Sequence, residues 1–435
     1  MPKPKAAGKS EELSSKKSGE VMRVLFVHPS YPSQFTNIGS ELNNDSNFQC
    51  FGLVHEGCAS MVRAAGQGMP HFCFRPDGET GSSSYAYALP FEAGMRNGRG
   101  IAHTVVSLDN AYHFDAIVGH AAFGSTLHLR DLTNAAVISY AELPGYQSMM
   151  ARPEFPMTFD MLLSSQSYKA LLYASMMHSD ICIAPSNHAR HLLPQELQTK
   201  TRVQMEGFAT DVNRGNKEQR AKLGLPVDAP LIGFFGRTLE AVRGFDVFVG
   251  VARRLREIEP AAQFLVIGDD QTIYGNERTY LGPMSFKNYS LARAGVSEDL
   301  FHWRSHMPYD DFRRHIACLD LAVLPLFEGA ANWNLYEAMA VGLPIVSADR
   351  GYVPEAIRNG RDGLLTDPAN VEQLVQLSLR LLRDRRLANR LGNSARRRIQ
   401  SDYSMPVAAA GYAQIIREAI RLRRARNQPC EVAVA

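Results

Sequence analysis

The stretch that decides the fold is LPLFEGAANWNLYEAMAVGLPI, at residues 324–345. The first residues of this stretch are the end of a short apolar run, which predicts a buried strand. The polar, glycine-containing segment 328–333 then predicts a loop. Residues 334–340 predict a helix, for which either Asn332 or Asn334 provides the N-cap. The stretch therefore indicates a strand–loop–helix unit, and a further strand begins where it ends.

The start of this predicted helix has the features of a nucleotide site. Backbone N–H groups at Asn334 and Leu335 suit a phosphate group, because the N-terminus of a helix carries partial positive charge. Glu337 lies in the first turn, where its carboxylate can accept hydrogen bonds from a ribose diol. The alternative is an ordinary strand–helix unit in which Glu337 only stabilises the helix dipole.

The same stretch resembles the signature of a known enzyme family. A loop followed by Glu-Ala-Met-Ala-x-Gly-x-Pro is similar to the motif of family 4 glycosyltransferases, retaining enzymes of the GT-B fold, and the match continues through Pro354-Glu355 and Gly363-Leu364-Leu365. The resemblance covers residues 230–412 well and the N-terminal half more loosely.

The resemblance implies a function. It implies transfer of a sugar from a nucleoside-diphosphate sugar, the co-substrate, to a hydroxyl group of a glycan, lipid-linked or small-molecule acceptor. Neither a cofactor nor a metal ion is expected. By analogy, the product belongs to a surface polysaccharide or another glycan.

One spacing departs from the family pattern. Family members commonly place two glutamates eight positions apart across this stretch, whereas Glu328 and Glu337 are nine apart. Glu337 matches the ribose-binding acid, since the Ala-Met-Ala motif follows it directly. Glu328 matches the acid that contacts the sugar hydroxyls only if the loop carries one extra residue. Otherwise it is not the equivalent acid, and the sequence leaves both alternatives open.

Two arginines after an earlier predicted strand indicate the rest of the donor site. Residues 231–237 predict a strand that ends in Gly236-Arg237, and Arg243 follows six positions later. Two guanidinium groups on one loop can clamp a diphosphate, although an isolated pair of arginines is more often solvated. The resemblance implies that Arg237 and Arg243 act in catalysis by stabilising the leaving diphosphate, with Gly236 beside the donor. It also places Met307 in the loop that holds the nucleobase through main-chain contacts.

In the N-terminal half, two polar residues follow predicted strands. His120 comes after the strand at 116–119, and Glu142 follows the strand at 136–140. Ligands of open α/β sheets bind beyond the carboxyl ends of strands, so both are candidates. A helix-capping or core histidine and a surface acid are the alternatives. The resemblance implies that His120 lines the reaction centre and that Glu142 lies where the acceptor binds. Residues 121–124 predict the approach to another helix.

Strand–helix alternation occurs twice along the chain. This predicts an α/β protein of the GT-B kind, with two Rossmann-like domains facing a cleft and a C-terminal helix that crosses back to the N-terminal domain. The last strand of the first domain is predicted at 203–208, and residues 271–294 predict a loop-like insertion of unknown role. The expected segments are a disordered tail (1–20), an acceptor domain (21–212), a linker (213–228), a donor domain (229–402), the returning helix (403–426) and a second tail (427–435).

Composition is that of an ordinary globular protein. The chain has 435 residues, 45% of them hydrophobic and 21% charged, and its net charge of +3 is too small to indicate a nucleic-acid partner. The six cysteines form no Cys-x-x-Cys pair, and no apolar run approaches the ~20 residues of a membrane span, so we expect a cytoplasmic protein with reduced thiols. Arginines within 396–398 and 421–426 suggest weak peripheral contact with the inner face of the membrane, although most such runs are solvated.

Missing motifs argue against other enzyme classes. The sequence has no Gly-x-Gly-x-x-Gly after a strand, no Walker-type Gly-x4-Gly-Lys-Ser/Thr and no Asp-x-Asp of the metal-dependent GT-A enzymes. A nicotinamide oxidoreductase and an NTPase are therefore poorly supported. The alternatives that stay open are a non-catalytic GT-B-like module that binds a nucleotide or glycan and, with a poorer fit to the motif, a GT-B epimerase.

Overall fold

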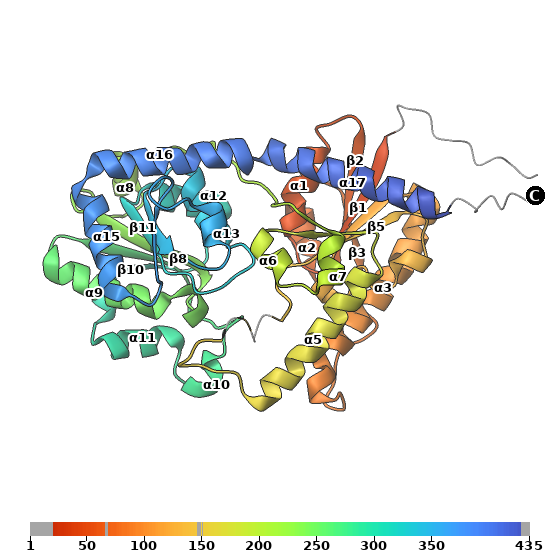
Figure 1. Cartoon of the computed structure of the whole chain (residues 1–435), viewed down its shortest axis with the longest axis horizontal. Coiled ribbons are helices and arrows are strands. Elements are labelled where there is room, and N and C mark those ends of the chain that lie inside the picture. Colours follow the sequence, from red (N-terminus) through yellow and green to blue (C-terminus); the bar gives the residue numbers. More distant parts are fainter. Residues whose placement is uncertain (1–20, 66–67, 146–148, 150, 428–435) are drawn as a thin grey trace, which may run out of the picture.

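The computed structural model describes residues 21–65, 68–145, 149 and 151–427. They form two parallel β-sheets that lie side by side along the long axis of the molecule, each packed between helices (Figure 1). The predicted pair of Rossmann-like α/β units is therefore confirmed.

The N-terminal sheet has seven strands, and three neighbouring strands, β4, β5 and β6, are buried along their whole length, as strands covered on both faces are. In spatial order the strands are β3 (His71–Phe74), β2 (Phe48–His55), β1 (Met22–Val27), β4 (Ala116–His120), β5 (Ala136–Tyr140), β6 (Ile181–Ala184) and β7 (Thr201–Val203). Its α-helices are α1 (Gln34–Leu42), α2 (Ala59–Ala65), α3 (Leu89–Tyr112), α5 (Phe159–Met177), α6 (Asn187–His191) and α7 (Gln195–Thr199).

The C-terminal sheet has six strands and holds the largest apolar core. In spatial order they are β10 (Phe301–Arg304), β9 (Gln263–Asp269), β8 (Leu231–Thr238), β11 (Leu321–Leu324), β12 (Ile345–Ala348) and β13 (Leu364–Thr366). Its helices are α8 (Lys217–Lys222), α9 (Phe245–Ile258), α10 (Glu277–Leu281), α11 (Phe286–Ala294), α12 (Tyr309–Ala317), α13 (Trp333–Ala340), α14 (Val353–Ala356), α15 (Val371–Arg383) and α16 (Arg385–Asp402).

The strand order reverses once in each sheet, between β1 and β4 and between β8 and β11. The loops that leave such neighbouring strands diverge to opposite sides, which opens a crevice at the carboxyl ends of the strands. His120 ends β4, the arginine loop follows β8, and Glu328 follows β11. The topology therefore puts these predicted site residues at the two points where an open sheet binds its ligands.

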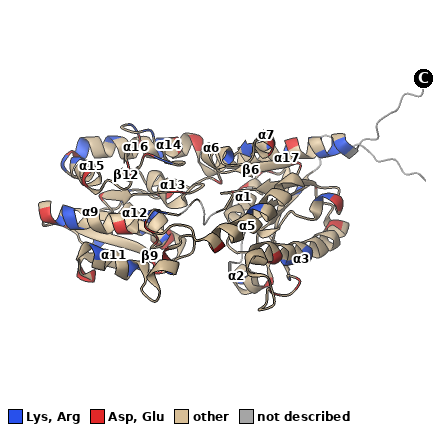
Figure 2. Cartoon of the chain, turned by 60° about the horizontal axis from the view of Figure 1, so that its bottom comes forward, with Lys and Arg blue, Asp and Glu red and all other residues tan. Residues whose placement is uncertain are grey.

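The last helix, α17 (Met405–Asn427), crosses back to the N-terminal half, as predicted (Figure 1). It packs against α1 and β5, and Tyr412 and Ile416 are fully buried in the N-terminal core. The basic C-terminal end of α17, blue in Figure 2, forms an ion pair and a hydrogen bond with the N-terminal half. Arg426 lies 3.0 Å from Asp180, and Arg423 donates to the carbonyl oxygen of Thr133 at 2.7 Å. Two of the arginines that suggested a membrane contact therefore dock the helix.

Three local predictions were wrong. Residues 121–124 lead only into short 3-10 turns, because Gly124 adopts a left-handed conformation that ends the first of them. The strand predicted at 203–208 ends at Val203, and Phe208 instead pairs with Ser404 next to the start of α17. The insertion 271–294 contains α10 and α11, not only a loop.

Two observations concern membrane and redox chemistry. No helix in the described part of the chain is long and apolar enough to cross a membrane. The cysteines at 50, 58, 73, 182 and 318 are free thiols, and Cys430 lies outside the described residues.

Candidate functional site

The loops after β8 and β11 lie against each other. The backbone N–H of Phe327 donates to the carbonyl oxygen of Val242 at 2.9 Å. Gly244 has a φ of 72°, and a Cβ atom there would lie 2.1 Å from the carbonyl oxygen of Pro325, so the position requires glycine. These two contacts place the arginine loop directly beside the 324–345 stretch.

Arg237 and Arg243 differ in how firmly they are held. Arg237 is exposed, whereas Arg243 is partly buried. A Cβ atom at Gly236 would lie 3.2 Å from Cδ of Arg243, so the glycine leaves room for this side chain. The Arg243 guanidinium lies 5.7 Å from the centre of the Tyr274 ring, which is a cation–π distance. Arg243 thus has a defined position, and Arg237 is free to approach a ligand.

A buried carboxylate that the sequence analysis missed, Glu240, holds the arginine loop together. Its side chain is fully buried, and Oε2 lies 3.4 Å from Nε of Arg243. Oε1 accepts hydrogen bonds from the backbone N–H groups of residues 273–275, at 2.6 Å for Tyr274. The Thr238 hydroxyl donates to Oε2 at 2.5 Å. Glu240 therefore ties Arg243 to the segment that carries Tyr274.

Glu337 is the fifth residue of α13, so it lies beyond the first turn in which it was predicted, and its carboxylate is buried in a small polar cluster. Only 2% of the residue is exposed. The Tyr309 hydroxyl donates to Oε1, and Nε of Arg313 lies 3.4 Å from Oε2. Burial outweighs these partners and raises the pKa of Glu337 to about 7. The predicted ribose-binding acid therefore already has protein partners, and both come from α12.

The cap of α13 is Asn332, one of the two predicted candidates. Its side chain accepts from the backbone N–H of Asn334 at 3.0 Å, and its carbonyl oxygen accepts from Leu335 N–H at 3.0 Å. The two N–H groups predicted for a phosphate are therefore already hydrogen-bonded to the cap. Met307 lies where predicted, in the loop between β10 and α12, where the neighbouring His306 N–H donates to Asp269 at 2.9 Å.

Glu328 contacts the other half of the molecule. Its Oε1 lies 2.8 Å from Nε2 of His188 in α6, and the pairing raises the pKa of His188. The contact is reinforced nearby, since the Ser186 hydroxyl donates to the carbonyl oxygen of Ala330 at 2.6 Å. Glu355 accepts from the backbone N–H at the start of α6. Sequence reasoning gave no signal for His188.

His120 and Glu142 come together at the carboxyl ends of β4 and β5. His120 is 3% exposed, its Nδ1 accepts from Ala122 N–H at 3.3 Å, and its Nε2 lies 4.0 Å from Glu142. One ring nitrogen therefore caps a turn, which was the alternative interpretation, and the other faces the acid. Burial, together with His28, holds the pKa of His120 well below its usual range, so the ring is neutral. Burial and Glu206 raise the pKa of Glu142.

Comparison with known proteins identifies the family of the chain. Residues 54–212 match the family model "Glycosyl transferase family 4 group", and residues 215–398 match "Glycosyl transferases group 1". The chain belongs to glycosyltransferase family 4. The predicted family is thus confirmed, and the two facing parallel sheets are the GT-B fold.

Curated relatives of this family 4 chain align over part of their length. A D-inositol 3-phosphate glycosyltransferase of Streptomyces bingchenggensis is 28% identical over 214 residues, 49% of this chain and 46% of the relative. An MMP alpha-(1->4)-mannosyltransferase of Mycolicibacterium hassiacum is 33% identical over 144 residues, 33% of this chain and 34% of the relative. The chain therefore spans less than half the length of these relatives.

Solved structures match over nearly the whole family 4 chain. Sucrose-phosphate synthase of Thermosynechococcus elongatus has a TM-score of 0.71 at 16% identity, covering 92% of this chain and 99% of its own. Anabaena Alr3699/HepE in complex with UDP-glucose has a TM-score of 0.66 at 15% identity, covering 91% of this chain and 100% of its own. At these identities the likeness shows the shared fold.

In this family 4 chain, Arg152 from the N-terminal half reaches the arginine loop. Its guanidinium lies 2.7 Å from Asp246, donates to the carbonyl oxygen of Ala241 at 3.0 Å, and lies 4.3 Å from the centre of the Phe327 ring. Arg152 is 6% exposed. It therefore touches the loops after both β8 and β11, and the sequence analysis did not identify it.

The segment that follows Arg152 packs against the insertion at residues 271–294. Phe155 is buried in the core of the C-terminal half, with its ring centre 5.8 Å from that of Phe286 in α11. The hydroxyl of Tyr280 in α10 donates to the carbonyl oxygen of Pro156 at 2.6 Å. The two helices of residues 271–294 thus form a platform that holds the two halves together beside the candidate site.

Proposed function

We propose that the protein is a retaining, metal-independent glycosyltransferase that moves a hexosyl group from a nucleoside-diphosphate sugar to a hydroxyl acceptor. The hydrogen bond between Val242 and Phe327 carries this proposal, because it puts the arginine loop beside the loop that leads from β11 into α13. Residues 21–212 would form the acceptor domain and residues 229–402 the donor domain, joined by the linker at 213–228.

Charge on the leaving group is the chemical problem that the arginine loop addresses. As the glycosidic bond breaks, the departing nucleoside diphosphate gathers negative charge. Arg237, which has no ion-pair partner among the described residues, and Arg243, oriented by Glu240, stabilise that charge. Preorganised groups of this kind contribute roughly 3–4 kcal/mol each in a site that excludes water.

The two glutamates have separate roles in this proposal. Glu337 binds the ribose hydroxyls once they replace the Tyr309 hydroxyl, which occupies Oε1 in the free protein. Glu328 reaches the donor sugar only when its ion pair with His188 opens. Binding of the donor would therefore exchange contacts within the protein for contacts with the ligand.

The acceptor would enter from the N-terminal half. His120 ends β4 at the switch point of that sheet, Glu142 follows the neighbouring strand β5, and Glu142 keeps 32% of its side chain exposed. We assign the neutral His120 ring to the lining of the reaction centre and Glu142 to a hydrogen bond with the acceptor hydroxyl. The acceptor itself is a glycan, a lipid-linked sugar or a small molecule.

A thermal-shift screen with UDP-, GDP-, ADP- and TDP-glucose tests the proposal, starting with UDP-glucose, the ligand of Alr3699/HepE. One donor should raise the melting temperature of the wild-type protein. R243A and E337A should lose the rise, and R390A, at an exposed position of α16, should keep it. An unchanged rise in R243A and E337A would contradict the site.

A non-catalytic nucleotide-binding module is the second candidate, favoured by the ion pair that occupies Glu328. Measuring the release of nucleoside diphosphate from the bound donor distinguishes the enzyme from the non-catalytic module. Slow release without acceptor supports the enzyme, and binding with no release above that of R243A supports the module.

A further inference from the structure

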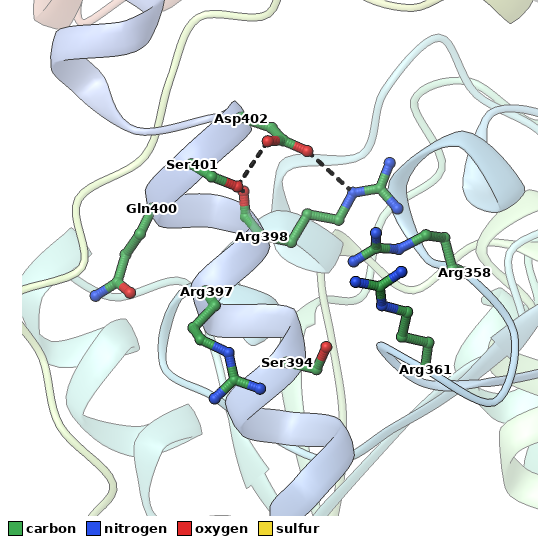
Figure 3. Close-up of a pocket in the computed structure, with 8 residues that line it drawn as sticks. All are labelled: Arg358, Arg361, Ser394, Arg397, Arg398, Gln400, Ser401 and Asp402. Atoms are coloured by element: carbon green, nitrogen blue, oxygen red, sulfur yellow. Dashed lines mark hydrogen bonds and ion pairs between the residues drawn. The ribbon is translucent and has the colours of Figure 1, made fainter.

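A basic pocket of about 640 Å³ lies between α16 and the segment that follows α14. Figure 3 shows the guanidinium groups of Arg358, Arg361 and Arg398 close to one another, with Arg397 on the same helix as Arg398. None of these residues belongs to the arginine loop or to α13. All the other lining side chains are polar, namely Ser394, Gln400, Ser401 and Asp402.

Two of the four arginines are fixed by carboxylates. The fully buried Asp362 lies 2.6 Å from Nε of Arg358 and 3.3 Å from Nη1 of Arg398, and it also accepts from the Ser394 hydroxyl at 2.8 Å. These partners lower the pKa of Asp362 to about 2, so it stays ionised. Asp402 lies 3.5 Å from Nε of Arg398. Arg358 and Arg398 are therefore held in place before any ligand arrives.

The other two arginines lack such partners. Arg361 and Arg397 are exposed and form no ion pair within the part of the chain that the structure describes. The pocket thus holds four guanidinium groups against two carboxylates, and like charges gathered in one place repel each other. A bound anion would relieve this repulsion.

We propose that this pocket binds the phosphate group of a small soluble molecule, at a site separate from the donor site. Guanidinium forks bind phosphate oxygens bidentately, and the tetrahedral arrangement of those oxygens suits donors that converge from two walls better than a planar carboxylate does. The lining has no apolar side chain that could anchor the pocket to a membrane. A small phosphomonoester, with a charge near −2 at neutral pH, matches the excess of two arginines.

The contacts of Arg398 indicate where hydrogen exchange should respond to a bound phosphate. Arg398 also donates to the carbonyl oxygen of Glu355 at 2.6 Å, and the Glu355 carboxylate accepts from the backbone N–H groups of Asn187 and His188 in the other half. Phosphate bound by Arg398 is therefore expected to slow hydrogen exchange over residues 355–361 and 394–402, the two walls of the pocket.

The experiment compares the double variant R361A/R397A with R390A, which removes an exposed arginine from the same helix outside the pocket. Inorganic phosphate is the probe, titrated against chloride at equal ionic strength to remove general screening. The phosphate-dependent rise in melting temperature and the protection of both walls should fall by at least half in R361A/R397A. Both should be kept in R390A and in R237A/R243A.

Three results would overturn the proposal. The first is a full phosphate response in R361A/R397A. The second is complete loss of the response in R237A/R243A, which would assign phosphate to the arginine loop alone. The third is cosedimentation with phosphatidylglycerol vesicles that depends on Arg361 and Arg397 without any response to free phosphate. That result would assign the arginines to a lipid surface.

Discussion

Arg152 and Asp246 form a buried ion pair, with 2.7 Å between Nη1 and Oδ1, although 94 positions separate them in the sequence. Asp246 lies in the first turn of α9, directly after the arginine loop. The pair therefore joins the N-terminal half to the element that positions Arg243. It explains how two halves with separate cores keep a fixed relation beside the candidate site.

Removing Arg152 should destabilise the protein. R152A leaves Asp246 buried without its close partner, and the loss of one member of a buried pair costs about 3–5 kcal/mol. Urea unfolding of R152A against the wild type measures this cost. The matched control is R293A, because Arg293 lies 3.8 Å from the same aspartate but is 51% exposed, and its loss should cost less than about 1 kcal/mol. Equal effects of the two variants would contradict the role given to Arg152.

Glu240 should act on the donor through Arg243. E240Q keeps the shape of the side chain but removes the charge that orients Arg243 and binds the segment 273–275. We expect kcat/KM for the donor to fall roughly 10- to 100-fold, mainly through KM, since about 1.4 kcal/mol corresponds to each tenfold step. Steady-state kinetics with the donor identified by the thermal-shift screen measures this. E257Q, an exposed site on α9, should be unaffected, and a fall in E240Q confined to kcat would count against a positioning role.

Binding of the nucleotide should depend on pH through Glu337. The ribose needs the ionised carboxylate, and the pKa of Glu337 in the free protein is about 7. Affinity should therefore rise about tenfold between pH 6 and pH 8, with net release of protons at pH 6. Calorimetry in buffers of different ionisation enthalpy detects both. E337Q should bind more weakly and without this pH dependence, and a flat wild-type profile would contradict ribose binding by Glu337.

Glu206 should make the fold less stable at higher pH. It is 1% exposed, near Tyr140 and Trp333, and burial raises its pKa from near 4.5 to about 7. A raised pKa means that the protonated form suits the fold, so its stabilisation is complete below pH 4.5 and is lost as pH rises through 7. The difference is on the order of 3 kcal/mol.

Urea unfolding at pH 5 and pH 8 tests this expectation. E206Q imitates the protonated side chain, so it should be more stable than the wild type at pH 8 and similar to it at pH 5. E196Q changes an exposed glutamate in α7 and should behave as the wild type at both values. A pH dependence of E206Q equal to that of the wild type would show that Glu206 is not the group responsible.

The sequence predicted those parts of the fold and site that local patterns determine. Apolar runs and caps located the strands around Glu337 and Arg243, and the strand-end rule put His120 at a switch point. Glu240, His188 and Arg152 could not be found this way. Each of them contacts at least one partner 33 or more positions away, which only the folded chain brings close.

The ion pair between Glu328 and His188 provides the last prediction. If Glu328 is the family's sugar-binding acid despite its spacing, E328A should lower kcat/KM at least about 100-fold. H188A should change it less than about tenfold, because a half-buried pair of this kind contributes about 1 kcal/mol. If Glu328 serves only to join the halves, both variants should have the same small effect.

The pH profile of this contact provides a second measurement. Glu328 raises the pKa of His188, so the ion pair stabilises the contact between the two halves at low pH. This stabilisation is lost as pH rises through the raised pKa of His188. Hydrogen exchange at the start of α6 should therefore, after correction for intrinsic rates, be slower at pH 6 than at pH 8. H188N, which cannot be protonated, should remove this difference while leaving the contacts of Ser186 and Glu355 in place. Exchange that responds to pH equally in H188N would exclude the pair as its cause.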